Sequence, residues 1–185
     1  AKAMTNFFIS DVVFNNDGSV YTAFDKSLDD SHDPMIVNNI TSCYGSAGFA
    51  NENGSNIVSC YSIVNGTVES TAGAASPFIN DSIYGQIAYC YSVFDSVVAA
   101  GIASGFINNV EHSTDIHDCY SIGKHISASD CAGGFSYKVY GSIKNCYSSC
   151  ENIDGSQVGA FCQSLPSSGS VDSCFITNGS SFIET

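Results

Sequence analysis

The stretch GSIKNCYS, residues 141–148, contains the pattern from which the fold can be predicted, because versions of it recur along the chain. Its core is a branched aliphatic residue, followed three positions later by a cysteine and then by an aromatic residue. Six copies occur without exception: Ile40 with Cys43, Ile57 with Cys60, Ile87 with Cys90, Ile116 with Cys119, Ile143 with Cys146, and Val171 with Cys174. Such self-similarity is typical of a solenoid, a propeller or an array.

A second landmark, a run of small residues that ends in phenylalanine, lies once between successive cysteines. It ends at Phe49, Phe78, Phe106, Phe135 and Phe161. The distance from each phenylalanine to the next cysteine is 11, 12, 13, 11 and 13 residues, whereas the distance from a cysteine to the following phenylalanine is 6, 18, 16, 16 and 15. The segment from phenylalanine to cysteine is therefore nearly constant in length. The segment from cysteine to phenylalanine is short only in the first repeat.

Repeats of roughly 28 residues, rich in turn residues and β-branched residues, are too small to bury a face alone and must stack. We therefore predict an all-β fold, a right-handed parallel β-helix of about five to six rungs, in which equivalent residues lie about 4.8 Å apart along the axis. A leucine-rich repeat would need more than Leu28 and Leu165, and a propeller needs a period of about 40 residues. The pattern leaves open whether the cysteine or the following aromatic residue points inward.

The segments GSIKNCYS at 141–148 and CAGGFSY at 131–137 resemble the GLUG-type repeat, over roughly residues 35–178. This resemblance implies the β-helical stalk of bacterial adhesins, which also occurs beside the catalytic domains of immunoglobulin-cleaving metallopeptidases. The chain departs from the family pattern where the expected asparagine is Tyr89 or Ser173. The motif is specific for architecture and carries little information on function.

The composition excludes several classes of partner. The chain has 185 residues, five lysines, no arginine and eighteen acidic residues, for a net charge of −13. Nucleic acid and anionic membranes are therefore not expected partners, because both need clustered basic residues. No apolar run approaches the roughly 20 residues that span a bilayer. The chain starts at Ala1 without a signal pattern, so we expect a processed or excised segment of an extracellular or cell-surface protein.

Three segments follow from the repeat. Residues 1–34 break the pattern and are expected to cap the first rung or to link subunits, residues 35–178 hold the β-helix, and residues 179–185 form a C-terminal tail. A solenoid end exposes unpaired backbone, which favours either a cap or head-to-tail self-association by strand addition. Both alternatives stay open for residues 1–34.

Cysteine chemistry is expected to be limited. A straight column of cysteines cannot surround a zinc ion tetrahedrally, so we expect buried thiols and no metal site. Cys131, Cys150 and Cys162 lie off the column, and a disulfide between Cys150 and Cys162 is one hypothesis for an oxidising compartment. No cofactor is expected. The acidic loop with Asp29, Asp30, His32 and Asp33 could hold Ca²⁺, but a solvated loop is favoured because the ligand spacing is irregular.

Enzymatic function is the less favoured interpretation. Hydrolysis of a glycan needs two carboxylates about 5–10 Å apart, and Asp115, Asp118 and Asp130 form the one plausible cluster. His112 and His117 do not form a zinc-peptidase motif. The leading hypothesis is a non-enzymatic stalk, adhesin segment or fibre subunit that contacts itself, a host surface or a glycan. The alternative is a carbohydrate-binding or carbohydrate-cleaving module. Five glycosylation sequons support a surface protein modestly, at Asn39, Asn53, Asn65, Asn80 and Asn178.

Overall fold

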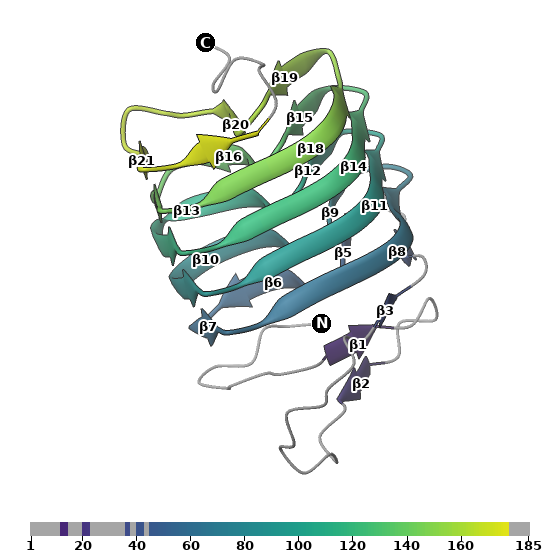
Figure 1. Cartoon of the computed structure of the whole chain (residues 1–185), viewed down its shortest axis with the longest axis horizontal. Helices are drawn as coiled ribbons and strands as arrows, with labels where there is room; N and C mark the ends of the chain where they lie inside the picture. The colour runs from purple at the N-terminus through teal and green to yellow at the C-terminus, as the bar shows by residue number, and fades with distance from the viewer. Residues whose placement is uncertain (1–11, 15–19, 23–35, 38–39, 43–44, 178–185) are drawn as a thin grey trace.

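The structure, a computed structural model, describes residues 12–14, 20–22, 36–37, 40–42 and 45–177. They form an all-β solenoid of about four turns with about 29 residues per turn. Figure 1 shows the turns stacked on one another, with the strands of each turn running parallel to those of the next. No helix long and apolar enough to cross a membrane occurs in this part of the chain.

Three parallel sheets form the walls of the solenoid. Sheet 1 has eight strands: β6 (Ala50–Gly54), β7 (Ile57–Val58), β10 (Ile79–Ala88), β13 (Ile107–His117), β16 (Ser136–Val139), β17 (Ser142–Lys144), β20 (Cys162–Ser164) and β21 (Ser170–Asp172). Sheet 2 has seven: β3 (Ile36–Val37), β4 (Ile40–Ser42), β8 (Tyr61–Ser70), β11 (Tyr91–Ala99), β14 (Tyr120–Ala128), β18 (Tyr147–Asp154) and β22 (Phe175–Ile176). Sheet 3 has five: β5 (Gly45–Ala47), β9 (Ala74–Ser76), β12 (Ile102–Ser104), β15 (Cys131–Gly133) and β19 (Gln157–Gly159).

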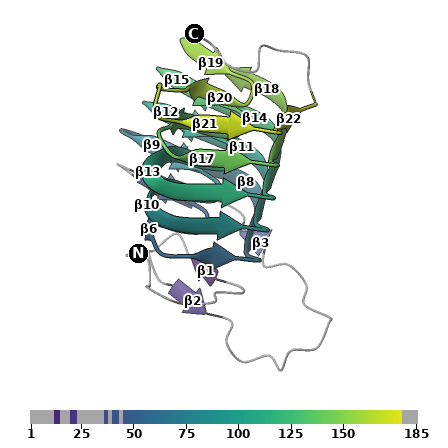
Figure 2. The same cartoon turned by 90° about the vertical axis from the view of Figure 1, so that its left-hand side faces the viewer.

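Each turn visits the three sheets in the same order, so a strand pairs with its counterparts one turn before and one turn after. In sheet 1, β10 pairs with β6 and β13, and in sheet 2, β11 pairs with β8 and β14. The shorter β12 pairs with β9 and β15 in sheet 3. Figure 2, turned by 90°, shows the same strands stacked along the axis.

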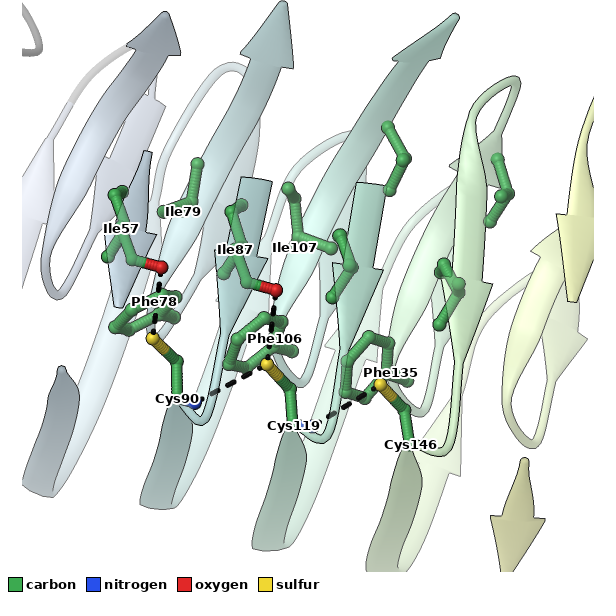
Figure 3. Packing of buried hydrophobic residues seen from close by; sticks show 14 of the residues in the cluster. Ile57, Phe78, Ile79, Ile87, Cys90, Phe106, Ile107, Cys119, Phe135 and Cys146 are labelled. Atoms are coloured by element: carbon green, nitrogen blue, oxygen red, sulfur yellow. Dashed lines mark hydrogen bonds between the residues drawn. The ribbon is translucent and has the colours of Figure 1, made fainter. Parts of the chain in front are cut away.

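The repeated aliphatic and phenylalanine residues form two buried columns. Sheet 1 pairs five members of the aliphatic set in register, Ile57, Ile87, Ile116, Ile143 and Val171. The phenylalanine rings stack face to face with centroids 4.6–4.9 Å apart, in the order Phe49, Phe78, Phe106, Phe135 and Phe161. Figure 3 shows the two columns beside each other with the cysteines. The prediction that equivalent residues overlie one another is therefore confirmed for these positions.

A second apolar cluster fills the space between sheets 2 and 3. Its members include Val68, Val97 and Ile126 from sheet 2 and Ala75, Ala103 and Ala132 from sheet 3. Buried serines that follow the Cys-aromatic pair run along sheet 2, and two of them bond to the small-residue run: Ser92 Oγ donates to Gly105 O at 2.5 Å and Ser121 Oγ to Gly134 O at 3.1 Å. In these two turns the hydroxyl joins the two sequence landmarks.

A left-handed residue makes the corner between sheets 1 and 2. The residue before the cysteine has a positive φ of 52–56° in every described copy: Ser59, Tyr89, Asp118, Asn145 and Ser173. This single conformation breaks the period-2 alternation, so that the aliphatic residue and the cysteine three positions later both point inward. It resolves the question that the sequence left open, because Cys90, Cys119 and Cys146 are buried whereas the following tyrosines are only partly covered.

Ile40 does not belong to the aliphatic column, which corrects the sequence prediction. Its strand β4 lies in sheet 2, where Ile40 pairs with Val68 rather than with Ile57. The reason is length: only six positions separate Cys43 from Phe49, too few for the sheet 2 strand that follows the cysteine in later turns. Cys43 itself lies outside the described residues.

Little of the N-terminal segment is described. Within residues 1–34, β1 (Val12–Phe14) and β2 (Val20–Thr22) pair antiparallel with each other, unlike the parallel strands of the solenoid. The acidic loop with Asp29, Asp30, His32 and Asp33 and the tail 179–185 lie outside the described residues. A capping or linking role for residues 1–34 stays a prediction.

Replacing Tyr89 by asparagine is expected to stabilise the solenoid. A positive φ at a bulky residue costs about 1–3 kcal/mol, and asparagine adopts it more readily. Tyr89 is 60% exposed, and its ring meets the His117 ring edge-on, so little packing is lost. We expect the free energy of unfolding in urea to rise by about 1 kcal/mol. The control is Tyr84→Asn, at an exposed strand position, and equal effects of the two substitutions would contradict the explanation.

Candidate functional site

The cysteine column is a hydrogen-bonded part of the core. Each described thiol of the column donates to the carbonyl oxygen two residues earlier, as from Cys119 Sγ to His117 O at 3.2 Å. The sulfurs of Cys90, Cys119 and Cys146 also accept the backbone N–H of the cysteine one turn earlier, as from Cys90 N to Cys119 Sγ at 3.4 Å. Dashed lines in Figure 3 mark the contacts from Cys90 N to Cys119 Sγ and from Cys119 N to Cys146 Sγ, and the longer contacts from Cys90 Sγ to Ile57 O and from Cys119 Sγ to Ile87 O. Cysteine suits this position because it is small and apolar and yet both donates and accepts.

The predicted disulfide between Cys150 and Cys162 is absent. Cys150 lies on β18 and packs in the cluster between sheets 2 and 3, whereas Cys162 lies on β20 and packs with the phenylalanine column. Burial raises the pKa of Cys150 to about 11 and that of Cys162 to about 12. Both thiols therefore stay protonated at neutral pH.

A column of tyrosines lies outside the cysteine column. The rings of Tyr61, Tyr91, Tyr120 and Tyr147 stack with centroids 4.8–5.5 Å apart and are half-buried. The column continues to Phe175, which is 66% exposed. Because the rings cover each other's faces, they present mainly their edges and hydroxyls to solvent.

Of the three carboxylates proposed as a catalytic cluster, Asp130 lies far from Asp118. Asp118 occupies the corner before β14 and accepts hydrogen bonds from His117 Nδ1 at 2.8 Å and Asn145 Nδ2 at 3.4 Å, which hold its pKa below the usual value. Asp130 follows the other end of β14, and a strand of nine residues spans about 30 Å. Asp115 lies on the exposed face of sheet 1. Asp130 therefore leaves the expected cluster, whereas Asp115 and Asp118 are only three residues apart in the chain.

A stepwise bulge interrupts the regular face of sheet 1. Ser82 and Tyr84 of β10 pair with Asn53 and Gly54 of β6 and with Val110 and Ser113 of β13. Between these paired positions β6 has no residue, β10 has one, Ile83, and β13 has two, Glu111 and His112. The next turn breaks the strand at Tyr140, between β16 and β17. The outer face of sheet 1 therefore protrudes increasingly from β6 to β13, and the protrusion ends in the next turn. Bulges commonly re-aim side chains beside functional sites.

Buried polar contacts hold the bulge from below. Thr114 Oγ1 donates to Ser82 O at 3.0 Å, and Asn53 Nδ2 donates to Ser82 Oγ at 3.1 Å, so three successive turns are tied together. Gly85 has a φ of 107°, and a Cβ there would meet the Ser55 backbone. The protrusion is therefore a defined shape held by the solenoid.

Two shallow depressions flank the protrusion and share His112 and Ser113. The first is acidic and is also lined by Glu52, Asp81, Ile83 and Glu111. The second is rich in hydroxyl groups and is also lined by Thr114, Asp115, Tyr140, Gly141, Ser142, Ser168 and Ser170. We call the two together the saddle. Aromatic contact connects its halves, because the His112 and Tyr140 rings lie 5.0 Å apart.

The acidic half gathers three carboxylates, those of Glu52, Asp81 and Glu111, and Lys138 interacts with Glu111. Burial raises the pKa of Asp81, the hydrogen bond from Asn109 Nδ2 at 2.6 Å opposes this rise, and the charges of Glu111 and Glu52 add to it. The Lys138 amine lies 4.9 Å from the centre of the Tyr140 ring, and the Tyr140 side chain and the charge of Glu111 both help to raise its pKa. In the described part of the chain, no three metal-ligating side chains converge on a common point.

The asparagines of the glycosylation sequons differ in burial. Asn53 and Asn80 are buried, and their amides are hydrogen-bonded, to Ser55 O and Ser82 Oγ for Asn53 and to Asn51 Oδ1 for Asn80. A glycan at either position would displace these contacts, so both are corrected to structural residues. Asn65 is exposed. Asn39 and Asn178 lie outside the described residues.

Sequence reasoning missed the saddle, although a signal for it was present. The distance from phenylalanine to cysteine increases from 11 to 12 to 13 residues over the first three turns, and each added residue is one step of the bulge. The triplet Cys-Tyr-Ser likewise recurs four times, and its serine bonds across the core in two of these turns. The first signal is a change in repeat length from turn to turn. The second is a residue beside the repeated motif rather than in it.

Comparison with known proteins gives no relative. No family model matches the chain, and neither the curated proteins nor the solved structures contain a significant match. The interpretation of function therefore depends on the chain's own geometry.

Thiol labelling is expected to divide the cysteines by burial. Cys131 and Cys174 are partly exposed, whereas Cys60, Cys90, Cys119, Cys146, Cys150 and Cys162 are buried. We expect iodoacetamide to modify the first two in the folded protein, slowly near neutral pH and faster as the pH rises, because the pKa values of both thiols are raised. The other six should react only in denaturant, because a buried thiol reacts when the structure opens. Peptide mapping by mass spectrometry measures this for each residue. Rapid labelling of Cys119 in the folded protein would show that the reagent reaches the cysteine column.

Proposed function

We propose that this chain is a non-enzymatic, extracellular structural or adhesive module, a segment of a surface stalk or fibre. The observation that carries the proposal is the continuity of the core: the stacked phenylalanine rings run without a gap from Phe49 to Phe161. Repeats that contact only their neighbours form a stiff rod whose length scales with the number of turns. A right-handed coil of five to six rungs, counting incomplete turns at both ends, completes the proposal.

The exposed chemistry supports a mechanical or adhesive role over catalysis. Asp130 is separated from Asp118 by the length of β14, and the described side chains include no converging metal-ligand group. A net charge of −13 disfavours polyanionic substrates and keeps neighbouring rods apart. The buried thiols are shielded by packing, so the column tolerates the oxidising conditions outside a cell.

Pulling the chain from its ends tests the mechanical role. A solenoid whose turns are joined by equivalent contacts is expected to unfold in steps of one turn, and about 29 residues release about 10 nm at 3.3–3.6 Å per residue. Single-molecule force spectroscopy measures the step length. Phe106→Ala removes one buried ring and should lower the unfolding force, whereas the exposed Ile83→Ala should not. One all-or-none event near zero force would contradict a load-bearing stalk.

Head-to-tail self-association is the proposed mode of fibre formation. The ends of a parallel stack offer backbone groups that a second copy can pair with. We expect long polymers, where they form, to be lost on deletion of residues 1–14, as seen by electron microscopy and light scattering. Circular dichroism of the shortened chain must show intact β structure, and filaments that persist after the deletion would exclude this segment as the link.

A further inference from the structure

The tyrosine column brings together side chains that can react with one another. Tyr91 and Tyr120 lie face to face, with ring centroids 4.8 Å apart and an angle of 1° between the ring planes. The Tyr61 ring lies 5.1 Å from that of Tyr91 at 9°, and the Tyr147 ring lies 5.5 Å from that of Tyr120 at 21°. Parallel pairing of β8, β11, β14 and β18 fixes this register, because each tyrosine begins its strand and pairs with the next. Neighbouring phenol rings are therefore held together before any reagent arrives.

Stacking alone does not explain why these rings are tyrosines. The buried phenylalanine column stacks equally closely, with centroids 4.6–4.9 Å apart. Phe175 pairs with Tyr147 at the last position of the tyrosine column, so the position itself accepts a ring without a hydroxyl. A phenol adds polarity at the half-exposed edge of the column. It also adds a reactivity that phenylalanine lacks, because a phenol loses an electron and a proton to mild oxidants.

We propose that the tyrosine column is a site of oxidative cross-linking, where hydrogen peroxide and a peroxidase join tyrosines of successive turns as dityrosine. In this reaction each phenol gives one electron and its hydroxyl proton to the oxidant. The two phenoxyl radicals form a carbon–carbon bond between ring positions ortho to the hydroxyls, and the hydrogens on these carbons move as protons to the phenol oxygens. Two tyrosines and one hydrogen peroxide thus yield one dityrosine and two waters.

The phenol groups lie close to one another and within reach of solvent, as this coupling requires. Burial raises the pKa of Tyr120, and the charges of Tyr91 and Tyr147 add to this rise because both neighbouring hydroxyls lie near its own. The three tyrosines occupy the first positions of β11, β14 and β18 and are each partly exposed. An oxidant in solution therefore reaches the edge of the column without rearrangement of the backbone.

The most exposed tyrosines of the described chain lack this arrangement. Tyr84 and Tyr89 are 49% and 60% exposed, but Tyr89 meets a histidine ring, and the stacked tyrosine pairs of the described residues include neither. Exposure alone favours coupling of Tyr84 and Tyr89 between molecules, whereas stacking favours coupling of the column within one molecule. The dependence of the product on protein concentration distinguishes the two.

A dityrosine in the column would lock one turn of the solenoid to the next. The bond between Tyr91 and Tyr120 closes a loop of about 29 residues, a full turn. Such a covalent loop restricts the unfolded chain, as a disulfide does, and it removes that turn from the length that force releases. The inference deepens the structural role proposed above and rests on it, whereas the coupling reaction is measured without assembly or force.

Two double variants with the same number of tyrosines test the proposal. The first, Tyr61→Phe with Tyr147→Phe, keeps one adjacent pair in the column. The second, Tyr91→Phe with Tyr147→Phe, keeps two column tyrosines that lie two turns, or about 9.6 Å, apart. Each full chain is treated with a haem peroxidase and limiting hydrogen peroxide, and the monomer is digested at aspartate and glutamate, which separates the column tyrosines. We expect about tenfold more cross-linked column peptide from the first variant, by mass spectrometry, because proximity favours coupling.

The unsubstituted chain provides a second measurement. The peptide that joins Tyr91 and Tyr120 should be the main product, because these rings are the closest and most nearly parallel of the column. Its yield should not change with protein concentration, and the cross-linked chain should unfold at a higher temperature.

Equal yields of column cross-links from the two double variants, or cross-links found only between molecules, would overturn the proposal. Circular dichroism checks that both variants keep their β structure, and phenylalanine keeps a stacked ring at each substituted position. Stepwise unfolding under force without dityrosine formation would leave the stalk proposal standing and remove only this one.

Discussion

Parallel backbone pairing between successive turns determines which residues this solenoid can contain. It places each residue directly against its counterpart one turn away, so every column must be compatible with itself. Phenylalanine, isoleucine, cysteine and serine meet this condition, because each can stack or hydrogen-bond with a copy of itself. Charged residues do not, since like charges in register repel, and only 12% of the residues are charged. Glu52 opposite Asp81 is an exception to this rule, and it lies in the saddle.

The left-handed corner explains why cysteine recurs. A positive φ at the residue before it turns the chain from sheet 1 to sheet 2 and leaves a carbonyl oxygen at the end of the strand pointing toward the core. Leaving such a group unpaired costs about 1–3 kcal/mol. The thiol satisfies it while adding apolar volume, and its sulfur accepts an N–H from the turn before. Alanine could not make either bond.

The repeat was sufficient to predict an all-β solenoid and the register of Ile57, Ile87, Ile116, Ile143 and Val171, because a periodic sequence in a parallel stack has few other arrangements. It failed at Ile40, where the motif recurs by chance within a shortened arm and pairs with Val68. The glycosylation sequon at Asn80 was a separate wrong prediction, because a local tripeptide carries no information on whether its asparagine is buried. Periodicity likewise says nothing about which corner a residue occupies, and Asp118 and Asp130 were grouped although β14 separates them.

A periodic scaffold can build a unique site only by departing from its period. A substitution in one turn changes a side chain but leaves the face flat, whereas an inserted residue changes the shape and shifts every neighbour on that face. The insertions at Ile83 and at Glu111 with His112 are of the second kind, and buried bonds from Thr114 and Gly85's backbone geometry maintain them. Maintaining a bulge disrupts ladder hydrogen bonds, so its presence in two successive turns argues for a use. In a solenoid, changes in repeat length are therefore a guide to function in addition to the repeated residues themselves.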